Sequence, residues 1–457
     1  MNEKKLSLKQ LIVMGGALFS MHFGASCMLY PVTWGKESGS SVFTAYIAIV
    51  LSALLLPLLA YVALSRGSGN FYSITRRISP KFGPIFCAVT VMIMGPIYVI
   101  PRMSAAAWAA LMQLTGIQTT SILPIFLFNC VYYAITYWFV SSRSDTVDKV
   151  GKILFPILIF IVVGVICKGL ITPISTEWQP KSYPESPLAY GFLQGYQTGD
   201  LPAALMFGMV IIQGIRKAGI PESGVNKNMV RLGLVGMGML AITHLGHMIV
   251  GAGTGGTIDL TLSALYSEVV LQLWGSIGAV FFNIALMFAA LTTAIGLAGS
   301  TAEYFEAAMD EKIPYKRVSL VTVIISTVLA SMGLDNIVTF VGPLLDCCYP
   351  AAIVVVIYYV LARNNLNPRY LNGARFAMFG AAAMGFIDVL STYNTLTGLN
   401  NASFSRIYSA IPLTSVRLTW ILVSILCFLI GLAVYRKKGE TILPHEDMVD
   451  TELPVTE

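Results

Sequence analysis

Residues 22–31, HFGASCMLYP, and residues 195–204, GYQTGDLPAA, decide the fold of this chain. Each stretch places glycine and polar residues in the middle of a long apolar segment, where a membrane helix is prone to unwind. Backbone groups freed at that depth are tolerated only where they line a cavity. Close packing against another helix is the alternative role for Gly24 and Gly199. The two stretches are therefore candidates for broken helices around a binding cavity.

The composition places the chain in a lipid bilayer. Of its 457 residues, 56% are hydrophobic and 11% are charged, whereas about 25% are charged in an ordinary soluble domain. The mean hydropathy of +0.74 excludes a soluble enzyme and also a soluble domain on a single anchor. The seven cysteines lie in apolar stretches without a CxxC pair or zinc-ligand spacing, so neither a disulfide framework nor a zinc site is expected.

Apolar windows of roughly 20 residues, the length of a membrane-spanning helix, follow one another along the chain. We predict an all-α polytopic membrane protein with twelve transmembrane helices, because each window is too long and too continuously apolar for a barrel strand. The predicted limits are 8–32, 42–65, 82–112, 119–141, 151–171, 188–215, 229–253, 271–302, 317–334, 337–361, 375–396 and 414–435.

The positive charges alternate between the two sides of the predicted bundle. Of 29 Lys and Arg residues, 23 fall at the termini and in the even-numbered loops, five fall on the other side, and Arg102 lies within the third span. This bias predicts an even number of spans with both termini in the cytoplasm. The net charge of +6 is thus explained by topology, so we expect no nucleic-acid partner.

Two interruptions five spans apart are typical of a transporter built from inverted repeats. Residues 1–435 are expected to form one transmembrane transporter domain. Its first repeat covers about residues 8–171, its second about 188–361, and two extra helices follow within 375–435. The acidic tail of residues 436–457 is expected to be cytoplasmic and disordered.

The chemistry of such a site follows from its exposed helix ends. Half-helices that start near Ser26 and Leu201 aim unpaired N–H groups at a carboxylate or another anion, and the opposing carbonyl ends attract cations. Asp200 adds a negative charge suited to an ammonium group or a coupling ion. The alternative for Asp200 is a structural acid that is protonated or paired with an arginine.

Two features bear on the coupling ion. Thr292 and Thr293 in the eighth span offer adjacent hydroxyl oxygens to Na+, although bonding to their own helix is the commoner use of threonine in membrane helices. His22 favours a proton instead, because histidine titrates near physiological pH. We expect Na+, since carbonyls of the first span complete a shell of neutral oxygens, whereas a proton path from His22 needs a relay that the sequence does not show.

His244 and His247 share one face of the predicted seventh span. No third metal ligand accompanies them, so we expect them to hydrogen-bond neighbouring helices. No cofactor other than the coupling ion is expected.

Motifs spread along the chain resemble those of the bacterial branched-chain amino acid:cation symporters. The resemblance covers nearly the whole chain, and its motifs are specific in combination. They are Gly24-Ala25 followed by Leu29-Tyr30-Pro31, Gly95-Pro96 through Ile100-Pro101-Arg102, Gly195-Tyr196, Thr198, Asp200, Ala203-Ala204, Phe207-Gly208, Thr293-Ala294, Gly296-Leu297, Ala302-Glu303 with Phe305, and Tyr349-Pro350.

The resemblance implies a transporter of the amino acid-polyamine-organocation superfamily, with a leucine-transporter-type core of two inverted five-helix repeats and broken helices 1 and 6. It implies uptake of leucine, isoleucine and valine across the bacterial cytoplasmic membrane, driven by Na+ or H+. The implied substrate site comprises Gly24, Ala25, Ser26, Cys27, Tyr196, Thr198, Gly199 and Asp200, and the implied cation site comprises Ala289, Thr292 and Thr293.

The chain departs from the family pattern around this implied site. Ser26 and Cys27 stand where the family usually has Gly-Asn, which removes an amide oxygen able to ligate an ion. Met103 and Ala109 replace a Thr and a Glu in the third span, and Asp346 stands in a segment that is usually more apolar. A symporter for a different small amino acid or organic solute is therefore one alternative function.

Two further alternatives belong to other classes. A passive channel would use the same apolar spans but has no need for paired breaks at mid-depth. An intramembrane enzyme requires a nucleophile–base set or a metal motif, which the sequence does not contain. A transporter is thus the expected class.

Overall fold

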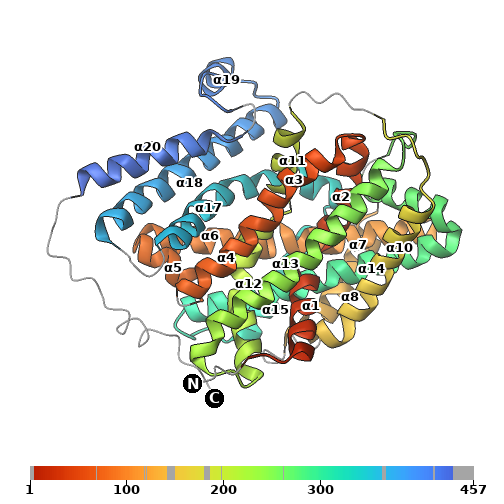
Figure 1. Cartoon of the computed structure of the whole chain (residues 1–457), viewed down its shortest axis with the longest axis horizontal. Helices are drawn as coiled ribbons and strands as arrows, with labels where there is room; N and C mark the ends of the chain where they lie inside the picture. Colours follow the sequence, from red (N-terminus) through yellow and green to blue (C-terminus); the bar gives the residue numbers. More distant parts are fainter. Residues whose placement is uncertain are drawn as a thin grey trace.

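A computed structural model describes residues 5–67, 69–117, 119, 121–141, 150–179, 186–196, 198–260, 262–362, 367–414 and 417–435. These residues form helices and turns, and no strand lies among them, as the prediction of an all-α protein requires. The helices pack side by side in one bundle (Figure 1). The predicted acidic tail of residues 436–457 lies outside the described residues.

The chain forms α-helices joined by short π-helical and 3-10 segments. They are α1 (Leu8–His22), α2 (Ala25–Ser38), α3 (Val42–Ile49), η1 (Val50–Leu55), α4 (Leu56–Arg66), α5 (Phe71–Ile78), α6 (Phe82–Met92), η2 (Ile93–Ile97), α7 (Val99–Thr115), α8 (Ile122–Val140), η4 (Val150–Leu154), α10 (Phe155–Ile171), α11 (Pro187–Tyr196), α12 (Asp200–Lys217), α13 (Glu222–Ala252), α14 (Leu262–Ala308), α15 (Tyr315–Ala330), α16 (Leu334–Asn336), η5 (Ile337–Val341), η6 (Gly342–Leu344), α17 (Leu345–Ala362), α18 (Pro368–Leu396), α19 (Ala402–Ser409) and α20 (Thr419–Val434).

Ten of the twelve predicted spans have the length and apolarity to cross a membrane. Within the described residues, nine helical stretches qualify, one of which includes α11 and α12, and α1 with α2 forms a tenth span bent by 69°. The windows 317–334 and 414–435 contain α15 and α20, which have 16 residues each. A helix of that length is about 24 Å long, shorter than a hydrocarbon core of about 30 Å. For these two helices, a full crossing stays a prediction.

Two helices extend well beyond their predicted limits. The seventh span was expected from residue 229, but α13 begins at Glu222, directly after the cap residue Pro221. The eighth was expected over 271–302, but α14 runs over 47 residues and bends at Gly275, where φ is +67°. Hydropathy locates the apolar part of a helix, whereas the helix itself continues into polar sequence until a cap ends it.

The first span is held in the bundle by a close crossing of α2 and α13. A Cβ added at Gly35 of α2 would overlap the carbonyl group of Met248, and one added at Gly251 of α13 would overlap the carbonyl oxygen of Val32. Small residues that let two backbones approach in this way are the usual contact in membrane helix packing. The crossing fixes the direction of α2 beyond the first-span break.

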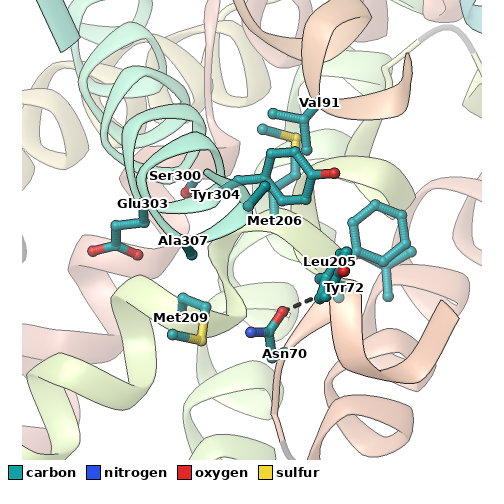
Figure 2. A pocket seen from close by; sticks show the side chains of 12 residues that line it. Asn70, Tyr72, Val91, Leu205, Met206, Met209, Ser300, Glu303, Tyr304 and Ala307 are labelled. Atoms are coloured by element: carbon teal, nitrogen blue, oxygen red, sulfur yellow. Dashed lines mark hydrogen bonds between the residues drawn. The ribbon is translucent and has the colours of Figure 1, made fainter. Parts of the chain in front are cut away.

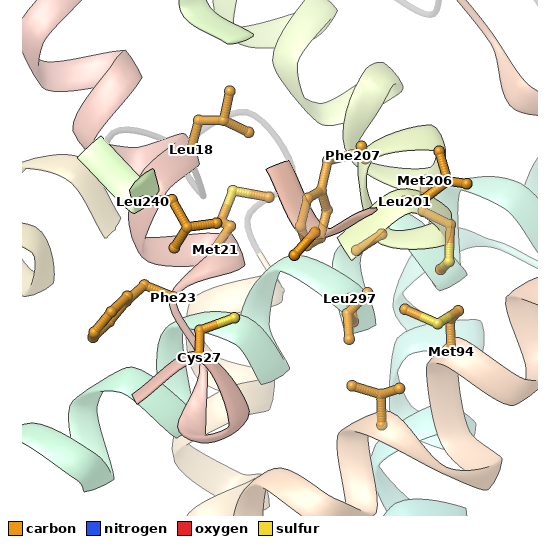
Figure 3. Close-up of a cluster of buried hydrophobic side chains, with 14 of the residues drawn as sticks. Leu18, Met21, Phe23, Cys27, Met94, Leu201, Met206, Phe207, Leu240 and Leu297 are labelled. Atoms are coloured by element: carbon orange, nitrogen blue, oxygen red, sulfur yellow. The ribbon is translucent and has the colours of Figure 1, made fainter. Parts of the chain in front are cut away.

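Buried side chains fill the space around that break. Leu18, Met21 and Phe23 pack there with Phe207 of α12 and Leu240 of α13 (Figure 3). All five side chains are fully buried. The core therefore surrounds the interruption and holds the two halves of the first span at a fixed angle.

Substituting Gly35→Ala should destabilise the protein by about 1–3 kcal/mol, because the new methyl group overpacks a backbone contact. The measurement is the apparent melting temperature in detergent, which should fall by several degrees. Gly238→Ala in α13 is the matched control, since nothing lies within 4 Å of its added Cβ. A Gly35→Ala protein that melts with the control would contradict the close crossing.

Candidate functional site

The first span is interrupted where the sequence predicted. Helix α1 ends at His22, and α2 begins at Ala25, one residue before the predicted start. A Cβ added at Gly24 would lie 2.6 Å from the Thr293 hydroxyl oxygen and 3.1 Å from the Met103 sulfur. Gly24 therefore combines the two alternative roles weighed for it, a helix break and close packing. It separates the half-helices and lets α14 and α7 approach the break.

The sixth span is interrupted in the corresponding place. Helix α11 ends at Tyr196, and α12 begins at Asp200, again one residue before the predicted start. Gly199 has φ +75°, a left-handed conformation that favours glycine. The Thr198 hydroxyl donates to the Gly195 carbonyl at 2.9 Å and accepts from the Asp200 amide at 3.4 Å. These local bonds hold the end of α11 and the start of α12 in the turn.

Asp200 joins the two breaks. One carboxylate oxygen is hydrogen-bonded to Nδ1 of His22 at 2.8 Å, and the other accepts from the Cys27 thiol at 3.5 Å. The other ring nitrogen of His22 is hydrogen-bonded to the Tyr61 hydroxyl of α4 at 2.8 Å. Asp200 is 2% exposed and His22 3% exposed. Pairing with an arginine, one form of the alternative in which Asp200 is a structural acid, does not occur among the described residues, because histidine is the partner of Asp200.

The threonine pair of α14 contacts the last turn of α1. The Thr292 hydroxyl donates to the Ser20 carbonyl at 2.7 Å and to the Ala289 carbonyl at 3.0 Å. The Thr293 hydroxyl donates to the Met21 carbonyl at 2.8 Å. Carbonyls in the last turn of a helix have no intrahelical partner, so the break itself exposes Ser20 and Met21. Two hydroxyl oxygens of α14 thus bond three carbonyl oxygens of α1 and α14, and the Thr293 hydroxyl also lies beside Gly24.

Aromatic rings cover the site from the side of α11. Tyr196 stacks on Tyr349 of α17, with ring centroids 4.2 Å apart and planes 26° apart. Near the start of α17, Asp346 accepts from Arg417 at 2.6 Å, and Arg417 also donates to Thr392 of α18 at 3.4 Å. The sequence marked Tyr349 as part of a family motif and Asp346 as a departure from the family pattern, but it did not reveal these contacts, because each joins residues far apart in the chain.

A separate pocket lies between α5, α6, α12 and α14 (Figure 2). It contains about 490 Å³ of empty space, part of which is open to solvent. Met206 also belongs to the cluster of buried apolar side chains near the break (Figure 3), so the pocket and that cluster share this side chain. The pocket is lined by Asn70, Phe71, Tyr72, Val91, Leu205, Met206, Met209, Ser300, Glu303, Tyr304, Ala307 and Ala308.

The predicted hydrogen bonds of the seventh-span histidines to other helices are wrong. His244 Nδ1 is hydrogen-bonded to the Leu240 carbonyl of its own helix at 2.9 Å. In the described part of the chain, neither ring nitrogen of His247 has a hydrogen-bond partner. Aromatic rings pack against His247 instead. The ring centroids of Phe23 and Tyr266 lie 5.9 Å and 5.3 Å from the centroid of the His247 ring.

The two third-span positions that depart from the family pattern, Met103 and Ala109, lie in different surroundings. Met103 reaches Gly24 at the break. Ala109 is half-buried, two turns further along α7. Cys27 and Ser26, in contrast, lie in the first turn of α2 and are buried. Cys27 contacts Asp200 directly.

Solved structures of transporters share this fold. Mhp1, a nucleobase-cation-symport-1 family transporter in a closed conformation with bromovinylhydantoin bound, has a TM-score of 0.57 at 11% identity, covering 93% of this chain and 92% of that chain. A manganese transporter of Eremococcus coleocola, in complex with an aromatic bis-isothiourea compound, has a TM-score of 0.60 at 17% identity, covering 94% and 97%. The broken helices and these likenesses define the class of fold as that of the leucine-transporter type.

The chain belongs to the family of branched-chain amino acid transport proteins, whose model matches residues 7–438. The branched-chain amino acid permease BraB of Bacillus subtilis is 29% identical over 440 residues, which are 93% of this chain and 95% of that protein. The prediction from the sequence motifs is thus confirmed. Membership in this family makes the protein a transporter rather than an enzyme.

Substituting Gly24→Ala should abolish substrate binding, because the added methyl group displaces Thr293 and Met103 from the break. Binding of labelled leucine to the purified protein measures the loss. The protein should remain monodisperse in detergent, since the neighbours are flexible side chains rather than backbone. Full leucine binding by Gly24→Ala would show that the close approach does not matter to the site.

Proposed function

We propose that this protein is a symporter that imports branched-chain amino acids across the bacterial cytoplasmic membrane, with both termini in the cytoplasm and Na+ as the coupling ion. The observation that carries the proposal is the meeting of two broken helices at Asp200, beside a cluster of neutral oxygens. Family membership supports the substrate class. The bias of Lys and Arg toward one side supports the orientation.

The helix ends suit the two charged groups of an amino acid. The start of α2 presents N–H groups without intrahelical partners, which favour a carboxylate. The carboxylate of Asp200 favours the ammonium group. Apolar side chains surround Gly199, with Met94 and Leu345 within 4 Å of its position, and they suit an aliphatic substrate. His22 and Cys27 contact Asp200 in this structure, so the ammonium group competes with them.

The oxygen cluster supports Na+ as the coupling ion. Na+ binds neutral oxygens, and Ser20, Met21, Ala289, Thr292 and Thr293 contribute five of them. The Thr292 hydroxyl lies within hydrogen-bond distance of the Ser20 and Ala289 carbonyls, and the Thr293 hydroxyl within that distance of the Met21 carbonyl. Rotation of the two hydroxyl groups would turn their lone pairs toward an ion without moving the backbone.

A proton is the second candidate for the coupling ion. The contact that favours it is the buried pair of His22 and Asp200, because histidine exchanges a proton near physiological pH. Tyr61 extends this pair to α4. The two candidates use different residues, so substitutions separate them.

Substituting Asp200→Asn should abolish leucine uptake into proteoliposomes, since the neutral amide cannot neutralise the substrate ammonium group. Uptake against a concentration gradient identifies a transporter, and equilibration alone would identify a channel. Asp388→Asn is the matched control, because Asp388 of α18 is also buried, at 4% exposed, and accepts a hydrogen bond from Tyr408 of α19. Asp200→Asn with uptake equal to that of the control would remove Asp200 from the substrate site.

Substituting Thr293→Ala should raise the Na+ concentration for half-maximal uptake by about tenfold, the effect of losing one ligand worth about 1.4 kcal/mol. His22→Phe should leave the Na+ dependence intact. Thr327→Ala controls for loss of a buried hydroxyl, because Thr327 bonds only its own helix. Uptake that follows a pH gradient, ignores Na+ and is lost in His22→Phe would assign the coupling to a proton.

A further inference from the structure

Arg102 is a buried positive charge that the proposed site does not yet use. It lies on α7, within the third span, and its side chain is 3% exposed. Its guanidinium group donates to the Tyr98 hydroxyl at 2.8 Å and lies 4.6 Å from the centre of the Tyr98 ring. The Nε donor of Arg102 is buried without a hydrogen-bond partner.

Neither contact neutralises the charge. Tyrosine is neutral, and the ion pairs recorded among the described residues do not include Arg102. A full charge at membrane depth is costly, and such residues usually pair with an opposite charge or serve a binding pathway. A buried donor without an acceptor adds to this cost. The surroundings of Arg102 therefore lack one anionic group.

The position of Arg102 indicates which anion neutralises its charge. Helix α7 contacts α2, whose Cys27 donates in turn to Asp200. The next residue, Met103, reaches Gly24 in the break. Arg102 thus lies on the helix that reaches the break before α2, where the helix N-terminus also favours an anion.

We propose that Arg102 binds the α-carboxylate of the transported amino acid, together with the N-terminal end of α2, while Asp200 receives the ammonium group. The inference rests on the proposed function and adds the requirement for a free carboxylate. Tyr98 holds the guanidinium plane through the hydroxyl and ring contacts, which leaves Nε and the remaining N–H groups for the substrate. An amine without a carboxylate leaves Arg102 buried and unpaired, so it binds poorly.

The test compares leucine with leucinol, which keeps the ammonium group and side chain but lacks the carboxylate. Dissociation constants of both ligands are measured by titration calorimetry on the full-length protein. Arg102→Gln should weaken leucine binding by about 10- to 100-fold, the effect of losing hydrogen bonds to a charged group, and leave leucinol binding within about threefold. Arg375→Gln, which loses a bond to the Ile78 carbonyl away from the break, should bind both ligands as the wild type does.

Arg102→Lys keeps the charge and guards against a folding failure of Arg102→Gln. Because lysine lacks the planar group of donors, its preference for leucine over leucinol should fall by about fivefold or more. A wild-type preference in Arg102→Lys, or in folded Arg102→Gln, would overturn the proposal. Leucine binding that needs chloride in the wild type, and loses that need in Arg102→Gln, would assign Arg102 to a free anion and also overturn it. Wild-type protein that binds no leucine would instead contradict the proposed function.

Discussion

The hydrogen bond between His22 and Asp200 joins the end of α1, in the first span, to the start of α12, in the sixth span. Both residues are buried in a region where water is not available to satisfy exposed helix ends. The bond therefore fixes the end of α1 relative to the start of α12. Tyr61 and Cys27 complete the hydrogen bonding of the pair and bring α4 and α2 to the same place.

The last turn of α1 contacts both proposed ligand sites. Its Ser20 and Met21 carbonyls lie against the threonines of α14, and its His22 ring lies against Asp200. A cation on the carbonyl side and a substrate on the Asp200 side would both act on the same three residues. In the proposed function, this shared turn is the physical basis of coupling, because either ligand positions the backbone that the other ligand uses.

The two breaks were predictable from sequence to within one residue, because glycine and polar residues stand out in apolar segments. Other parts of the site were not predictable. Carbonyl oxygens such as those of Ser20 and Met21 carry no side-chain signal, and the partner of Asp200 depends on the packing of spans that are 178 residues apart in the chain. His247 shows the reverse error, since a polar side chain that suggested a hydrogen bond packs between aromatic rings instead.

Helices α18 and α20 brace α17. A Cβ added at Gly385 of α18 would lie 2.6 Å from the Asp346 carbonyl oxygen, so the two backbones are in close contact there. Arg417, just before α20, pairs with the carboxylate of the same Asp346. One turn further along α17, Tyr349 stacks on Tyr196 at the end of α11. A displacement of Tyr349 that uncovers the sixth-span break must therefore break or carry along the contacts of Asp346. Helices α18 and α20 thus have a direct influence on access to the candidate site.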